Sequence, residues 1–165
     1  MLGVDPGTAA TGYGVVERPD DGGPLRLIEC GVIRPPARGT LARRLAVIHE
    51  ELAALIARHR PGAMAVETVF VSQNARSALV LGHARGVILL AGEQAELAIA
   101  EYAPRQVKAA VVGAGAATKP QVGLMVAKLL RLRHAPEPAD AADGVAVALT
   151  HCLTGMRRFR RAKVG

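Results

Sequence analysis

Four acidic side chains occupy positions where a charge is costly, and their types suit divalent-metal chemistry. The chain of 165 residues contains five aspartates, two of which lie in a turn. Of the other three, Asp5 closes an apolar run, and Asp140 and Asp143 lie near the start of a segment rich in alanine and valine. Glu67 ends another apolar run. Because a buried carboxylate without a partner is strongly destabilising, such groups generally bind a cation or stay protonated.

The spacing of the last two aspartates indicates a shared ligand. Asp140 and Asp143 are three positions apart, which on a helix places both carboxylates on one face, about 60° apart around the axis. Carboxylates without well-spaced cysteine or histidine partners select hard cations, Mg²⁺ or Mn²⁺. Two such ions about 4 Å apart are a common device for phosphodiester cleavage, where one activates a water and the other stabilises the leaving 3′ oxygen. We therefore expect two Mg²⁺ ions, with Mn²⁺ as a substitute.

Each acid also has a structural explanation. Asp140 at a helix start is a good capping residue, and the helix dipole stabilises an acid there. Asp5 precedes a proline and a glycine and is a common turn opener. Considered together, in a chain this poor in aspartate, the four acids favour the metal site.

Basic residues are distributed unevenly around these acids. The net charge is +7; residues 102–136 contain six basic and no acidic residues, and the last nine residues contain five basic ones. Residues 137–156 contain three acids and no base. This pattern is typical of a protein that binds a polyanion such as nucleic acid. A solvated helix face followed by a solubilising tail would give the same charges.

Length and composition exclude several classes of protein. A chain of 165 residues, half of them apolar, is typical of one packed domain, because domains usually span about 100–200 residues. The longest apolar runs fall short of the roughly 18 residues of a spanning helix, and the early Asp5 argues against a secretory leader. Cys30 and Cys152 are too far apart in sequence for a metal-binding pair. We expect a cytoplasmic protein with no disulfide, no structural zinc and no membrane association.

The pattern of apolar residues predicts an α/β fold with the order βββαβαβααα. Strands are expected at residues 1–4, 12–16, 25–33, 63–66 and 97–102, the first three as an antiparallel meander. An amphipathic helix should begin after Thr40 and end before Pro61, because leucine and isoleucine recur there at spacings of three and four. Further helices are expected at 74–91, 104–112, 119–133 and 139–153. This order fits a mixed sheet with helices on its faces.

Several segments match one family in order and without large gaps. The segments are GVDPGT (3–8), TGYG (11–14), VETVF (66–70), GHARG (82–86), EYAPRQVK (101–108) and DAAD (140–143). Together they resemble the RuvC Holliday junction resolvases, over about residues 2 to 153. The resemblance implies an RNase H-like fold with a five-stranded mixed sheet: three antiparallel strands plus parallel ones. In that fold the first and fourth strands are parallel neighbours, which would bring Asp5 beside Glu67.

The resemblance also implies an activity and partners. It predicts a homodimeric, Mg²⁺-dependent endonuclease that resolves four-way junctions by paired nicks in homologous recombination and DNA repair. A RuvA–RuvB branch-migration complex is the implied partner. The expected catalytic and metal-binding residues are Asp5, Glu67, Asp140 and Asp143. The nuclease domain would span residues 1–155, followed by a flexible basic tail at 156–165.

Four further residues are expected to contact DNA. Lys108 and Lys119 match the family's basic positions and should contact backbone phosphate, and Arg105 is a third basic candidate. Phe70 could stack on an unpaired base, although a core or dimer contact is an alternative. Residues 74–90, with two glycines one turn apart, are the candidate dimer interface or a fully buried helix.

Two other functions remain open on sequence alone. Residues 5–8 also resemble the phosphate loop of actin-like ATPases, but those proteins need two such lobes and this chain has room for one. A non-catalytic junction-binding subunit is the second alternative, although a complete set of four acids argues against it. ATP hydrolysis without DNA would support the first, and a junction-nicking assay with and without Mg²⁺ distinguishes the second.

Overall fold

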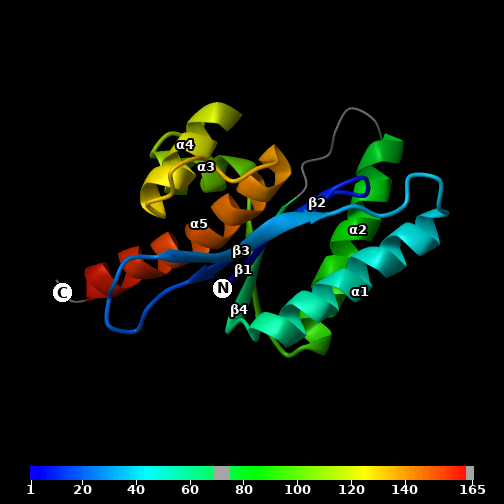
Figure 1. The fold of residues 1–165 in the computed structure, drawn as a ribbon, viewed down its shortest axis with the longest axis horizontal. Coiled ribbons are helices and arrows are strands. Elements are labelled where there is room, and N and C mark those ends of the chain that lie inside the picture. The colour runs from blue at the N-terminus through cyan, green and yellow to red at the C-terminus, as the bar shows by residue number, and fades with distance from the viewer. Residues whose placement is uncertain (69–74, 163–165) are drawn as a thin grey trace.

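The computed structural model describes residues 1–68 and 75–162, with the side chains described through residue 154. Its strands are β1 (Leu2–Asp5), β2 (Thr11–Glu17), β3 (Arg26–Ile33), β4 (Ala63–Glu67) and β5 (Ala98–Tyr102). Its helices are α1 (Leu41–His59), α2 (Ala75–Gln94), α3 (Pro104–Val112), α4 (Lys119–Leu129) and α5 (Ala139–Ala162). The predicted element order is therefore confirmed (Figure 1).

The strands form one mixed sheet in the order β3-β2-β1-β4-β5. The pairs β1–β2 and β2–β3 are antiparallel, as the predicted meander requires. The pairs β1–β4 and β4–β5 are parallel. The first and fourth strands are thus neighbours, as the family resemblance implied.

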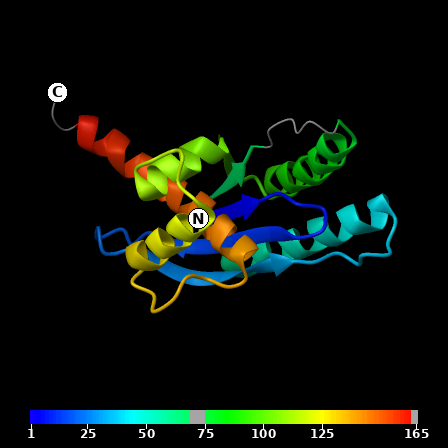
Figure 2. The ribbon, with the colours of Figure 1, turned by 90° about the horizontal axis from the view of Figure 1, so that it is seen from above.

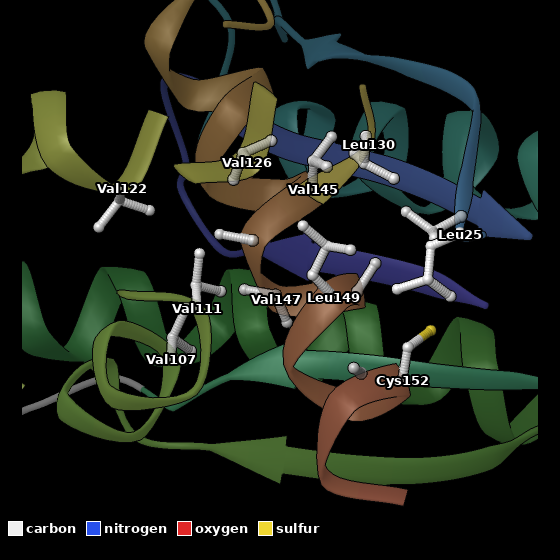
Figure 3. Close-up of a cluster of buried hydrophobic side chains, with 14 of the residues drawn as sticks. Leu25, Val107, Val111, Val122, Val126, Leu130, Val145, Val147, Leu149 and Cys152 are labelled. Atoms are coloured by element: carbon white, nitrogen blue, oxygen red, sulfur yellow. The ribbon is translucent and has the colours of Figure 1, made fainter. Parts of the chain in front are cut away.

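Helices cover both faces of the sheet. Helices α1 and α2 pack on one face and α3, α4 and α5 on the other, with α5 crossing the sheet (Figures 1 and 2). Each face of the sheet has its own hydrophobic core. Figure 3 shows the core between the sheet and α3, α4 and α5, where valines and leucines of these helices converge. Its labelled members include Val107, Val111, Val122, Val126, Val145 and Leu149.

Local sequence explains where two of the helices begin. The Thr40 hydroxyl accepts a hydrogen bond from the Arg43 amide at 3.2 Å, so it caps α1, which begins after Thr40 as predicted. At the start of α4, the Gln121 side chain accepts from the Thr118 amide at 2.8 Å, which completes a capping box. These caps fix the starts of the helices and thereby the backbone position of Lys119.

Some boundaries differ from the prediction. Helix α4 ends at Leu129 rather than at residue 133, and Arg131 adopts a positive φ of 54° beyond it. Helix α5 continues to Ala162 rather than ending at residue 153, because arginine and alanine favour helix even after the apolar pattern stops. The backbone of residues 156–162 is therefore helical; the division of the chain at residue 155 stays a prediction.

Two compositional expectations bear on the fold. Cys30 and Cys152 are both free thiols in the structure. Within the described residues, every helix is too short or too polar to cross a membrane.

Candidate active site

The two strands at the centre of the sheet carry one acid each at corresponding ends. Strands β1 and β4 run parallel, with Val4 opposite Val66, so Asp5 and Glu67 follow on adjacent strand ends. Side chains alternate between the two faces of a strand. Leu2 and Val4 are buried against α1 and α2, so Asp5 projects to the opposite face, toward α5.

The same alternation applies on β4. Met64 and Val66 belong to the core under α1 and α2, whereas Ala65 packs in the core under α5. Glu67 therefore shares the face of Ala65 and of Asp5. A four-residue strand and a five-residue strand thus position both carboxylates side by side.

Glycines allow α5 to lie unusually close to this face. A Cβ atom at Gly3 would overlap the backbone of Ala148, and one at Gly12 would overlap the carbonyl oxygen of Asp140. At Gly14 a Cβ would lie 2.6 Å from the Cα of Val145. This close packing lays the first turns of α5 over β1 and β2 and brings Asp143 to the two strand acids.

Three of the four predicted acids line one cavity of about 220 Å³. Asp5, Glu67 and Asp143 lie in its wall together with Lys108 and Lys119. Apolar side chains complete the lining: Pro104, Val107, Val122 and Ala146. The carboxylates thus meet water on one side and the protein core on the other.

One of the lysines is bonded to an acid. Lys119 Nζ donates to Asp143 Oδ2 at 2.7 Å, with the Lys119 side chain 70% exposed and that of Asp143 21% exposed. The hydrogen bond to Asp143 raises the pKa of Lys119 above its usual range, so the ammonium form is favoured.

The two strand acids hold their protons more tightly than free carboxyls. Burial, then the nearby Asp143, raises the pKa of Asp5 to about 6, against a partial offset from Lys119. Burial, then Asp5 and Asp143, raises the pKa of Glu67 to about 7. Each anion destabilises the others in this partly dehydrated space, so the site favours a bound cation.

The donor set fits a hard divalent cation in its chemistry. Carboxylate oxygens on a buried edge are the ligands that Mg²⁺ and Mn²⁺ prefer, and the raised pKa values of Asp5 and Glu67 arise from charge that a cation would neutralise. Within residues 1–68 and 75–162, however, acid, histidine and cysteine side chains do not group tightly enough to ligate an ion as they stand. The ammonium of Lys119 instead neutralises one of the acids.

The fourth predicted acid lies farther away. Asp140 is outside the lining of the cavity, although its charge contributes to the raised pKa of Asp5. Arg105 is exposed in the first turn of α3, also outside that lining. Phe70 lies outside the described residues. His151 contacts the Tyr102 hydroxyl through Nδ1 at 2.9 Å and does not line the cavity.

Two residues that support the turn after Asp5 were missed by the sequence analysis. The buried Thr11 hydroxyl donates to the Gly7 carbonyl at 2.6 Å. The Arg44 guanidinium, from the first turn of α1, donates to the carbonyl of Thr8. A local pattern in the sequence gives no sign of the second contact, because its partners are 36 positions apart.

Comparison of the chain with protein families and curated proteins gives consistent matches. Residues 1–151 match the family model described as crossover junction endodeoxyribonuclease RuvC. A crossover junction endodeoxyribonuclease RuvC of Halorhodospira halophila is 54% identical over 92% of this chain and 88% of that protein. One of Azorhizobium caulinodans is 49% identical over 98% of this chain and 95% of that protein.

Solved structures show the same similarity in three dimensions. Thermus thermophilus RuvC superposes with a TM-score of 0.86 at 36% identity, covering 95% of this chain and 96% of its own. The same protein in complex with a Holliday junction substrate gives 0.86 at 35% identity, covering 93% of both chains. The yeast mitochondrial Holliday junction resolvase Ydc2 has a TM-score of 0.64 at 13% identity, over 98% of this chain and 84% of its own, and shares the fold.

Proposed function

Since this chain belongs to the RuvC family of crossover junction endodeoxyribonucleases, it is a Holliday junction resolvase, and we propose that it cuts the junction at a magnesium site built from its grouped carboxylates. The observation that carries the proposal is the meeting of three acids from distant parts of the chain around one cavity. The acids assigned to the site are Asp5, Glu67, Asp140 and Asp143.

Each acid has a distinct part in this proposal. Asp5 and Glu67 are fixed to the sheet and supply the rigid side of the site. Asp143 lies on α5 and reaches the cavity from the opposite side. Asp140, one turn earlier on α5, lies outside the cavity lining and acts on the site through its negative charge. Two Mg²⁺ ions, or Mn²⁺ in their place, would supply activation of the attacking water and stabilisation of the leaving 3′ oxygen.

The lysines of the cavity are suited to the substrate rather than to the metal. Lys108 and Lys119 line the cavity beside the acids, and an ammonium group is a common ligand for backbone phosphate. They would hold the scissile strand against the carboxylates. Arg105, exposed one helical turn before Lys108, is assigned to a neighbouring phosphate, and Phe70 stays assigned to an unpaired base.

A nicking assay on a synthetic four-way junction tests the proposed function. With Mg²⁺ the protein should place one nick in each of two opposed strands and leave 5′ phosphate and 3′ hydroxyl ends. With a chelator it should bind the junction without cutting it. Cutting that persists at an unchanged rate in the chelator would contradict the metal site, and binding without cutting under all conditions would favour a junction-binding subunit.

We also propose that the active form is a homodimer whose interface includes α2. An apolar groove of about 490 Å³ lies beside α2, where Leu79 is 65% exposed and Leu90 is 50% exposed. The groove also includes Gly82 and Gly86, and a Cβ at either glycine would meet open space. Helix α2 is thus buried on one side by Ala84 and Ile88 but open on the other, unlike the fully buried helix that was the alternative.

A second copy of the chain is the occupant that suits this groove. A twofold dimer presents two equivalent sites, which matches the two equivalent strands of a four-way junction. Leu79→Glu should turn the dimer into a monomer in analytical ultracentrifugation and uncouple the paired nicks. If this variant remains a dimer, α2 does not form the interface. The predicted RuvA–RuvB partner and cytoplasmic location remain expectations from the family resemblance and the cysteine content.

A further inference from the structure

We infer that Lys119 competes with the catalytic cation for Asp143: its ammonium holds the carboxylate until metal binds, and the displaced ammonium then becomes available to the DNA phosphate. This inference rests on the proposed function, because it presupposes that Asp143 is a metal ligand. It assigns to one lysine a part in coupling metal binding to substrate binding.

The contact between the two side chains has the geometry of a strong but releasable bond. Nζ of Lys119 lies 2.7 Å from Oδ2 of Asp143, a short charge-assisted hydrogen bond. The lysine side chain is nevertheless 70% exposed, so water replaces the bond readily when it breaks. The ammonium can therefore leave without the protein unfolding around it.

The backbone on both sides of this contact is fixed. Lys119 is the first residue of α4 and lies between Thr118 and Gln121, the two residues of the capping box. Asp143 lies on α5, which packs closely on β1 and β2 through the glycine contacts. Because the helices hold both α-carbons, exchange of the carboxylate between two cations needs only rotation of the long lysine side chain.

The two cations require the same carboxylate, that of Asp143. Within the described residues, acids, histidines and cysteines do not come together closely enough to ligate a metal as they stand, while Oδ2 of Asp143 accepts from the ammonium. A divalent ion near Asp5 and Glu67 would attract Asp143 and repel the lysine. Removing the ammonium should therefore make the metal bind more tightly.

The surroundings of Lys119 provide a place for the displaced ammonium. Lys119 and Asp143 line both the acidic cavity and a second cavity of about 420 Å³, whose walls include Pro120, Pro136 and Pro138. The lysine thus stands between two open spaces beside the proposed scissile phosphate. Release by metal would present it to DNA, so metal and junction should each strengthen the binding of the other.

Lys108 is a matched control for simple electrostatics. It lines the same acidic cavity and lowers the pKa of Glu67 through its charge. Among the residues that the structure describes, the ion pairs do not include Lys108. Removing the charge of Lys108 changes the electrostatic potential at the site but breaks no ion pair with a carboxylate. The effect of this substitution on metal affinity therefore measures the electrostatic contribution alone.

Isothermal titration of Mg²⁺ into the DNA-free protein tests the inference without any cleavage. Lys119→Met should bind Mg²⁺ about fivefold more tightly than the wild type, whereas Lys108→Met should change the affinity by less than about twofold. Glu67→Gln in the wild-type background should abolish the heat of Mg²⁺ binding. That result would show that the measured Mg²⁺ binds at the proposed site. Thermal melting of each variant confirms that it is folded.

A second measurement follows the lysine itself. In ¹⁵N-labelled protein, the ammonium signal absent from Lys119→Met belongs to Lys119, and it should shift when Mg²⁺ is added. Equal or weaker Mg²⁺ binding by Lys119→Met, or a signal that Mg²⁺ leaves unchanged, would overturn the inference while the metal site stands. If the wild type gives no Mg²⁺ binding that Glu67→Gln removes, the metal site of the proposed function fails, and the inference fails with it.

Discussion

Gly12 on β2 faces the backbone carbonyl of Asp140 so closely that a Cβ atom at position 12 would overlap that oxygen. The first turn of α5 can lie on the sheet only because residue 12 has no side chain. Since α5 also carries Asp143, the glycine indirectly sets the distance between the helix acid and the two strand acids.

Gly12→Ala should therefore damage both stability and cleavage. Relief of the overlap must push the start of α5 off the sheet, at a cost of about 2 kcal/mol, which lowers the melting temperature by roughly 5 °C. A shift of this kind at the site should slow cleavage by about 100-fold. Gly62→Ala is the control, because a Cβ there meets open space. Equal behaviour of the two variants would argue against close packing of α5.

Asp143→Asn should abolish nicking while junction binding is retained or strengthened. The change removes a proposed metal ligand, for which we expect a rate loss of more than about 100-fold. It also removes a negative charge near the DNA phosphate, which favours binding. Single-turnover cleavage and gel-shift titrations on the same junction measure the two effects. Cleavage at the parent rate would show that Asp143 holds no essential ion.

Lys119→Ala should slow cleavage and reduce the salt dependence of junction binding. Loss of one phosphate contact lowers the slope of log affinity against log salt by about 0.9. Arg26→Ala is a suitable comparison, because Arg26 pairs with Glu17 at the opposite end of the sheet from Asp5 and Gly12. A slope that Lys119→Ala leaves unchanged would remove this lysine from the phosphate contacts.

The raised pKa of Glu67 predicts how stability depends on pH. Folded Glu67 keeps its proton until about pH 7, whereas the unfolded chain loses it near 4.5. In metal-free protein, this carboxyl stabilises the fold at low pH, and that contribution is lost as the pH rises from about 4.5 to about 7. Asp5, whose pKa is raised to about 6, acts in the same direction over a lower range.

Urea unfolding at several pH values, without metal, measures this effect. Glu67→Gln should lessen the loss of stability between pH 5 and pH 8, an interval chosen to span the pKa of about 7, whereas Glu51→Gln, at an exposed position of α1, should not. Mg²⁺ should stabilise the wild type most at the high-pH end, because the ion binds the deprotonated carboxylates. A wild-type profile that Glu67→Gln leaves unchanged would mean that Glu67 ionises normally.

Much of the fold could be predicted because local signals agreed with it. The spacing of apolar residues after Thr40 and the cap itself defined α1, and the prolines and glycines between apolar runs marked the strand ends. The helix ends were predicted less well. Helix α4 ends at Leu129 and Arg131 beyond it adopts a positive φ, although residues 129–133 contain no proline or glycine that would signal this end.

The sequence indicates which residues form the site but not which of them contact each other. The scarcity of aspartate and the apolar runs before Asp5 and Glu67 singled out these acids, and alternation along the strands explains why they meet. The ion pair of Lys119 with Asp143 was missed, because its partners are 24 positions apart and belong to different helices. Contacts of this kind depend on how α4 and α5 pack together, which periodicity does not reveal.

The wide separation of the acids along the chain also has a consequence during synthesis. Asp5 leaves the ribosome early and Glu67 midway, but Asp143 takes its place only once α5 has folded onto β1 and β2. A truncated product that lacks this last helix would expose the apolar face of the sheet and lack two of the four acids. Under the proposed metal site, such a fragment should cut no DNA, because Asp140 and Asp143 are missing from it.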